Sequence, residues 1–180
     1  MTTPYQDFTD LVIHTIKGKD YEIHIRDLGA HVTIAAIQGG RIEPLTSELA
    51  DAIAGQEYNL YDFGGIRASD NEQMRIPASR FDEVRLRTLM KRSHTAISIQ
   101  GVEGAKAIVH IGERNRHLKD ILTAKLNESG FGTSGPASAG AAHNPSRFYN
   151  LPQAGGIQIE LTESLRQSMT DCPLQDLQRQ

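Results

Sequence analysis

The stretch from residue 32 to residue 55 constrains the fold more than any other part of the chain. An apolar, β-branched run from Val32 to Ile37 is typical of a buried strand. The run ends at the diglycine Gly39-Gly40, and Pro44 followed by Thr46 indicates the start of a helix. In α/β proteins, ligands bind where the carboxyl end of a buried strand faces the start of a helix. We therefore expect a ligand site at this turn.

Further apolar segments alternate in type along the chain. The expected strands cover residues 8–16, 21–26, 58–63, 95–100, 107–111 and 156–161, and the expected helices cover residues 83–92, 115–128 and a short segment around 165–169. The first two strands would form a hairpin, and Asp82 would cap the helix that follows it. Alternating strands and helices predict an α/β fold with an open, mixed, mostly parallel sheet and helices on both faces.

The organisation of the chain is expected to be simple. We predict a single domain over residues 1–180, with a mobile small-residue linker at residues 132–140 and a frayed tail at residues 171–180. No apolar run of about 18 residues is present, so no membrane span is expected. The N-terminus lacks a secretion signal and Cys172 is the single cysteine, which predicts a cytoplasmic location.

Charge and histidine spacing bear on the partners. The chain has 19 basic and 22 acidic residues, a formal charge of −3 that argues against nucleic-acid binding. The seven histidines show no zinc-finger spacing. His14 and His24 are expected to be solvent-facing strand residues, and a relocated metal site at His110 or His143 is left open. A homo-oligomer is also left open.

Four segments of the chain then match motifs in a fixed order. They are residues 38–48 (QGGRIEPLTSE), 74–84 (MRIPASRFDEV), 98–101 (SIQG) and 156–161 (GIQIEL), the last followed by Leu165-Arg166. These segments resemble HGGxIEPGTSE, LHITSxxFDEP, SIHG and GVQLEL of the poly-γ-glutamate hydrolase family, small zinc enzymes of phages and bacilli. The resemblance covers about Tyr21 to Met169 and implies a zinc carboxypeptidase-like fold.

The departures from the family pattern concern the metal. The resemblance implies that the zinc ligands are at positions 38, 43 and 100 and the general base is Glu160, but this chain has Gln38 and Gln100 where the family has histidines. Amide oxygens are poor zinc ligands, so we expect no metal and no cofactor. Without a metal, no bound water of pKa about 7 is available for hydrolysis. The family's arginine near Asn150-Leu151 is also missing.

Arg75 replaces a further family histidine that faces the site. One hypothesis is that Arg75 supplies a positive charge near Glu43 and Glu160, as the metal would. The alternative is that Arg75 points into solvent. The backbone of the diglycine turn could also cradle an anion, although such turns are common for geometric reasons alone.

These observations predict a binding protein on a degenerate hydrolase scaffold. It would hold a small anionic ligand, either a γ-glutamyl compound or, given the phage associations of the family, a nucleotide signal that a phage-encoded protein sequesters. The expected ligand-binding residues are Gln38, Gly39, Gly40, Arg41, Glu43, Arg75, Gln100, Gln158 and Glu160. Two alternatives are kept: a metal-dependent hydrolase of poly-γ-glutamate or related amide bonds, and a structural or partner-binding domain with a vestigial site.

Overall fold

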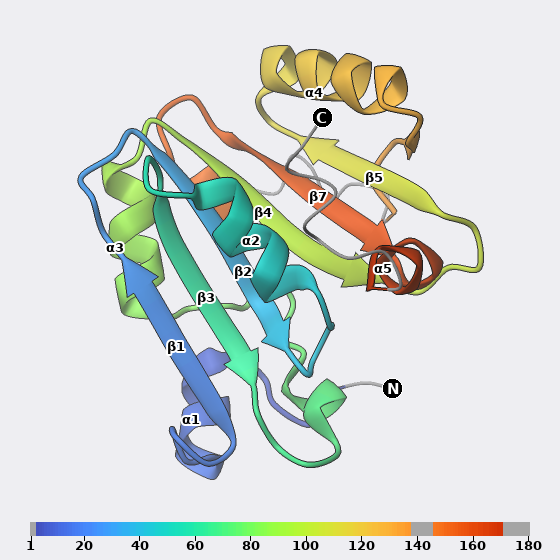
Figure 1. Ribbon diagram of the computed structural model, residues 1–180. Coiled ribbons are helices and arrows are strands. Elements are labelled where there is room, and N and C mark those ends of the chain that lie inside the picture. Colours follow the sequence, from blue (N-terminus) through green and yellow to red (C-terminus); the bar gives the residue numbers. More distant parts are fainter. Residues whose placement is uncertain (1–2, 138–145, 171–180) are drawn as a thin grey trace.

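The computed structural model describes residues 3–137 and 146–170, and its centre is one seven-stranded sheet (Figure 1). The strands are β1 (Tyr21–Arg26), β2 (Val32–Gly40), β3 (Asn59–Gly65), β4 (Thr95–Val102), β5 (Ile108–Glu113), β6 (Gly132–Ser134) and β7 (Gly156–Thr162). Their order is β1-β3-β2-β4-β7-β5-β6. The central pairs β3-β2, β2-β4 and β4-β7 are parallel, whereas β1-β3 and β5-β7 are antiparallel.

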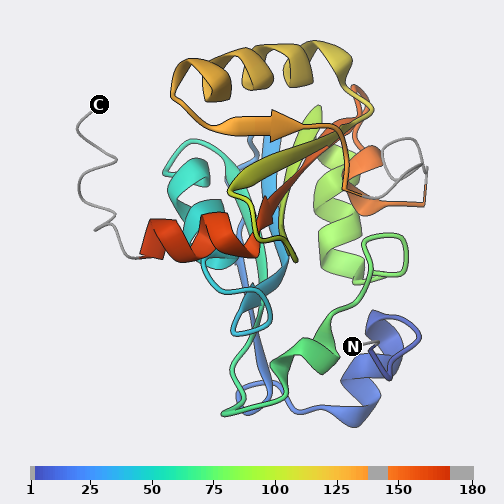
Figure 2. The ribbon, with the colours of Figure 1, turned by 90° about the vertical axis from the view of Figure 1, so that its right-hand side faces the viewer.

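Helices cover both faces of this sheet (Figure 2). The helices are α1 (Phe8–His14), α2 (Thr46–Ala54), α3 (Val84–Arg92), α4 (Arg116–Glu128) and α5 (Glu163–Thr170), with short 3-10 turns η1 (Asn71–Met74) and η2 (Phe148–Asn150). Helices α1 and α3 pack on one face, and α2, α4 and α5 pack on the other. The predicted class, a mixed and mostly parallel α/β sheet between helices, is confirmed. No described helix has the length and apolar composition to cross a bilayer.

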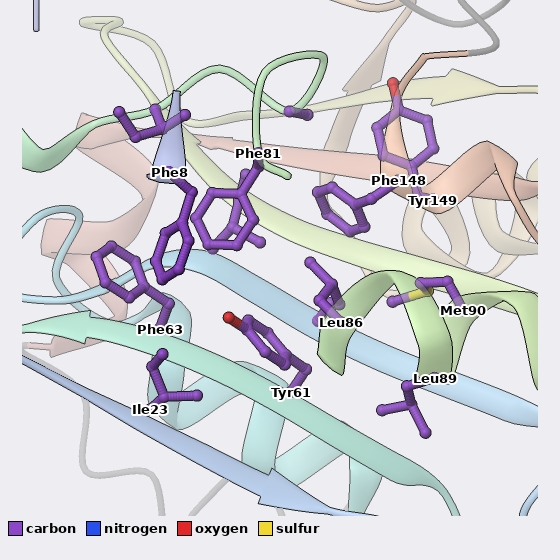
Figure 3. Close-up of a cluster of buried hydrophobic side chains, with 14 of the residues drawn as sticks. Phe8, Ile23, Tyr61, Phe63, Phe81, Leu86, Leu89, Met90, Phe148 and Tyr149 are labelled. Atoms are coloured by element: carbon purple, nitrogen blue, oxygen red, sulfur yellow. The ribbon is translucent and has the colours of Figure 1, made fainter. Parts of the chain in front are cut away.

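The two sheet faces carry different cores because side chains alternate along each strand. On β2, Ala35 and Ile37 face α1 and α3, while Ile34 and Ala36 face α2. The first core is rich in aromatic rings (Figure 3). We call it the aromatic cluster: Phe8, Tyr21, Tyr61, Phe63, Phe81, Phe148 and Tyr149. Phe81 is central to it, with ring centroids of Phe8 at 4.8 Å and Phe63 at 5.6 Å.

The first predicted strand is wrong, because residues 8–14 form helix α1. The side chain of Asp7 caps this helix by accepting a hydrogen bond from Asp10 N. Phe8 and Leu11 are buried one turn apart, whereas Ile13 is 73% exposed, so burial follows a helical period. The predicted hairpin is therefore absent: β1 pairs with β3 at the edge of the sheet. His14 is exposed as expected, but on a helix.

Three smaller expectations also change. Glu83 rather than Asp82 caps α3, since its carboxylate accepts from Leu86 N at 2.7 Å. Asp82 instead accepts hydrogen bonds from the backbone and hydroxyl of Thr9. The start of the predicted linker forms strand β6, which pairs with β5. Residues 138–140 at the end of the predicted linker lie outside the described residues. The same holds for His143 and for the tail after residue 170, which includes Cys172.

Candidate functional site

A cleft lies at the carboxyl ends of the central parallel strands. Its volume is about 350 Å³. It is lined by Thr3, Gln38, Arg75, Pro77, Ala78, Arg80, Gln100, Arg147, Gln158 and Glu160. The lining groups come together because β2, β4 and β7 run in parallel, and Gln100 pairs with Glu160 in the β4-β7 register. Five of the predicted site residues line this cleft.

Gln158 is the centre of a hydrogen-bonded network that we call the amide network, comprising Gln100, Arg147, Tyr149, Gln158 and Glu160. Its Nε2 donates to Gln100 Oε1 at 2.9 Å and to Glu160 Oε1 at 3.1 Å. Its Oε1 accepts from Tyr149 OH at 2.6 Å and from Arg147 Nη1 at 2.8 Å. Buried amides need such partners, so the network holds these side chains in one arrangement.

The two glutamines at the positions where the resemblance implies histidines are both bonded within the protein. Gln38 Nε2 donates to the carbonyl of Ile76 at 3.0 Å, and Gln100 Nε2 donates to Ser98 Oγ at 3.2 Å. Gln100 Oε1 is occupied by Gln158. Both side chains are buried. Both amide nitrogens and Gln100 Oε1 are therefore engaged within the protein, while the two side chains still line the cleft.

Glu43 is 1% exposed and does not line the cleft itself, but it lies behind the lining residue Arg75. Its Oε2 accepts a hydrogen bond from the Gly101 backbone, and its Oε1 is 3.0 Å from Arg75 Nε. This second contact is an ion pair without hydrogen-bond alignment, since Arg75 Nε has no hydrogen-bond partner in the described residues. Burial raises the pKa of Glu43 to about 7, against the opposing effects of Arg75, the Gly101 N–H and Arg166. Arg75 thus faces Glu43 and the cleft, and does not simply point into solvent.

Zinc does not fit this set of side chains. Of the three family positions only Glu43 carries a good zinc donor, and its oxygens already contact Arg75 and the Gly101 N–H. Within residues 3–137 and 146–170, no group of three or more His, Cys, Asp or Glu side chains is arranged to hold a metal ion. His110 lies opposite Glu160 in the sheet, with its Nδ1 3.0 Å from the Gly135 carbonyl.

The diglycine turn is separate from the cleft. Gly40 N donates to Ser47 Oγ at 2.8 Å and Arg41 N donates to the Gly65 carbonyl at 2.9 Å, so these N–H groups are not free to cradle an anion. A Cβ on Gly39 would collide with Ser47 Oγ, and Gly40 has φ +58°. The guanidinium of Arg41 bonds the Arg67 carbonyl. Gly39 and Gly40 are thus the last residues of β2, paired with Gly64 and Gly65 of β3, and Arg41 begins the turn that follows.

Two residues of the amide network, Arg147 just before η2 and Tyr149 within it, are outside the predicted set of ligand-binding residues. Arg147 and Tyr149 both bond Gln158, and Arg147 Nε is buried with no hydrogen-bond partner in the described residues. The resemblance implies an arginine near Asn150-Leu151, and Arg147 lies three residues before Asn150 in this chain. The only sign of Arg147 and Tyr149 in the sequence is the basic and aromatic segment 147–149. Its position in a loop did not indicate that it would reach the site. Glu160 Oε2 also accepts from Ala137 N at 3.0 Å.

The sequence profile of the family described as Poly-gamma-glutamate hydrolase matches residues 5–178. Three proteins of Bacillus subtilis (strain 168) are similar. UPF0714 protein YndL is 30% identical over 172 residues, covering 92% of this chain and 66% of YndL. UPF0714 protein YmaC is 27% identical over 171 residues, covering 93% of this chain and 72% of YmaC. SPbeta prophage-derived UPF0714 protein YoqZ is 30% identical over 152 residues, covering 83% and 55%. The chain thus spans about half to three quarters of these relatives.

Two solved structures share the fold. The structure described as "YNDL-apo (Zinc-free)" superposes with a TM-score of 0.86 at 28% identity and covers 92% of this chain and 83% of its own. The "Structure of Bacteriophage poly-gamma-glutamate hydrolase" superposes with a TM-score of 0.87 at 22% identity and covers 91% and 81%. Each likeness covers more than nine-tenths of this chain, so the fold is shared.

Proposed function

We propose that this chain, which belongs to the poly-γ-glutamate hydrolase family, binds a small anionic molecule in the cleft without hydrolysing it. The observation that carries the proposal is the hydrogen bonding of the Gln38 and Gln100 side chains. Both amides stand at positions where the resemblance implies histidines, and both are bonded to other protein groups. An amide in such a network is a specific hydrogen-bonding group and a poor zinc ligand.

The charges of the cleft support an anionic ligand. Arg75, Arg80 and Arg147 line it, and guanidinium groups are suited to carboxylate and phosphate. The lining carboxylate Glu160 already accepts hydrogen bonds from Gln158 and Ala137 N. Arg147 Nε is a buried donor without a partner among the described residues, and such donors are costly unless a ligand or water satisfies them.

Two ligand classes fit this chemistry. A γ-glutamyl compound presents carboxylates and amides, and its amides would match the glutamine side chains of the cleft. A nucleotide signal presents phosphates, and the prophage origin of YoqZ keeps sequestration of such a signal among the candidates. Both classes would be held by the same arginines.

Isothermal titration calorimetry against nucleotides and γ-glutamyl oligomers tests the proposal, together with an assay for cleavage of each bound compound. Arg80→Gln and Arg41→Gln form a matched pair, since both arginines are exposed but only Arg80 lines the cleft. We expect Arg80→Gln to weaken binding about three- to fivefold and Arg41→Gln to leave it unchanged. Silence across the panel, or equal effects of the two variants, would contradict the proposal.

A second candidate is a metal-dependent hydrolase of γ-glutamyl or related amide bonds. It is favoured by the retention of two carboxylates at family positions, Glu43 behind Arg75 and Glu160 in the cleft. Elemental analysis of the purified protein separates the candidates: the binding protein is expected to contain no stoichiometric metal. The double variant Gln38→His with Gln100→His should then acquire zinc. Stoichiometric metal in the unaltered protein, with chelator-sensitive cleavage of poly-γ-glutamate, would favour the hydrolase.

A further inference from the structure

A second cavity of about 280 Å³ shares Arg75 with the cleft. It lies between the turn before α2 and the whole length of α5, which Figure 1 shows beside the end of β4. It is lined by Ile42, Pro44, Arg75, Glu103, Glu163, Arg166, Gln167 and Thr170. Two guanidinium groups therefore border one small cavity.

Arg166 is the unusual member of this lining, because its side chain is charged and the residue is 9% exposed. Nε donates to the Leu161 carbonyl at 3.3 Å and Nη1 donates to the Pro44 carbonyl at 3.0 Å. Nη2 makes no hydrogen bond within residues 3–137 and 146–170, and it is not among the fully buried atoms without a partner, so this donor is open to the cavity that Arg166 lines. A largely buried guanidinium with one donor open to a cavity can bind an anion that enters there.

Gly101 explains how the guanidinium is accommodated. A Cβ at Gly101 would lie 2.8 Å from Arg166 Cζ and 2.9 Å from Nη2, so a side chain at that position would displace the arginine. The same Gly101 donates its N–H to Glu43. Gly101, near the end of β4, therefore leaves room for Arg166 beside Glu43, and its backbone N–H binds Glu43.

We propose that this second cavity is an anion site that takes one phosphate- or carboxylate-sized group between Arg166 and Arg75. The inference deepens the proposed function, because a cleft and a cavity that share Arg75 suit a ligand with two anionic groups. It rests on that function for the identity of the ligand, but the anion site itself can be tested alone.

Two carboxylates in the cavity lining would repel a bound anion, so replacing them tests whether an anion binds in this cavity. Glu103 and Glu163 line the cavity and are exposed, so replacing either should not disturb the core. Removing one nearby negative charge should strengthen the binding of an anion about two- to threefold. Glu57→Gln is the matched control, because Glu57 is an exposed glutamate of neither the cleft nor the cavity.

The experiment is a titration of the full chain with inorganic phosphate, followed through the side-chain Nε–H NMR signals of arginine. Arg166→Lys and Arg147→Lys assign the two signals that report on the cavity and the cleft. We expect the Arg166 signal to shift with a saturating curve. Arg166→Gln lacks this signal, so its binding is followed through the Nε–H signal of Arg75, which lines the same cavity and is assigned with Arg75→Lys, and we expect phosphate binding there to weaken at least about tenfold. Glu103→Gln and Glu163→Gln should each tighten the same curve, which keeps the test valid if Arg166→Gln does not fold.

The two signals separate the two proposals. Shifts of the Arg147 signal alone would overturn the second site and leave the cleft as the binding site. Shifts of the Arg166 signal alone, strengthened by both glutamine variants, would support the second site and count against the cleft. An Arg166 signal that does not move, or that responds equally in Glu57→Gln and Glu163→Gln, would overturn the inference.

Discussion

The aromatic cluster and the amide network are neighbours on one side of the sheet, and both are buried, but different interactions hold them. Rings in the aromatic cluster meet over broad apolar surfaces, such as Phe8 on Phe81, and their stabilisation scales with area. Gln158 in the amide network is held by four directional hydrogen bonds. Tyr149 belongs to both, with its ring edge-on to Phe148 and its hydroxyl on Gln158.

This difference separates stability from recognition. Net stabilisation by a hydrogen bond is only about 1 kcal/mol, whereas burying a large aromatic side chain contributes several times that. The amide network therefore adds little to folding when complete, but it fixes the positions of the groups that face the cleft. Mutations in the two regions should affect different measurements.

The largest effect is expected from Phe81→Ala, which removes a ring at the centre of the aromatic cluster. Phe81 is 1% exposed and contacts Phe8, Phe63, Tyr61 and Phe148. We expect a loss of about 3–5 kcal/mol in the free energy of unfolding, measured by chemical denaturation. Phe81→Leu should lose less because it fills more of the space. A loss below about 1 kcal/mol would show that the cluster does not dominate stability.

The next effect is a pH dependence of the free energy of unfolding, which originates at Glu43. Its pKa is raised by burial from 4.5 to about 7, so the folded state binds its proton more tightly than the unfolded state does. The resulting stability is fully present below pH about 4.5 and is lost as the pH rises through about 7, a change of up to about 3 kcal/mol. Denaturation of the unaltered protein and of Glu43→Gln across this range tests it. Glu43→Gln should show the flatter profile, and identical slopes would contradict the prediction.

A smaller loss of stability is expected from Gln158→Leu. The variant removes the hydrogen bonds that Gln158 Oε1 accepts from the hydroxyl of Tyr149 and from Arg147 Nη1, although Arg147 Nη1 keeps its bond to Tyr149 OH at 3.2 Å; the two lost bonds cost about 1–3 kcal/mol. Binding in the cleft should fall more severely, because Arg147 and Gln100 lose the group that orients them. Calorimetry and denaturation together measure the two effects. Gln153→Leu, at an exposed glutamine, is the control and should change neither.

The smallest effect is expected from Val84→Ser. Apolar spacing predicts that Val84 lies on the buried side of its helix, but it is 75% exposed at the first position of α3. The variant should change the free energy of unfolding by less than about 0.5 kcal/mol. A larger loss would mean that the core extends to this surface.

Much of the fold follows from local patterns. The run of β-branched residues in β2, the glycines after it and the helix start at Thr46 all appear where they were expected. The exception is α1, where Phe8, Leu11 and Val12 suit a strand or a helix and the decisive signal is the cap formed by Asp7. A short apolar segment does not distinguish the two periods, so tertiary burial decides the outcome.

The site was predicted in part. Parallel strands that end at one edge of the sheet bring together Gln38, Glu43, Gln100, Gln158 and Glu160. The positions of these residues in the matched motifs predict that they lie near one another. Arg147 and Arg166 were not predicted as site residues. The first reaches the cleft from the η2 segment, and the second becomes notable only because Gly101 leaves room for it beside a cavity.

The sequence by itself determined the family, the alternation of strands and helices, and the presence of glutamines at positions 38 and 100, where the resemblance implies histidines. Those are properties of residue type and spacing, which are local. Only the tertiary structure decided what the amides do, because an amide both donates and accepts and its partner depends on which groups the fold places nearby. Gln100 meets Gln158 from 58 positions away in the chain, and Arg75 meets Glu43 across the same site. Such pairings depend on how strands pack in three dimensions.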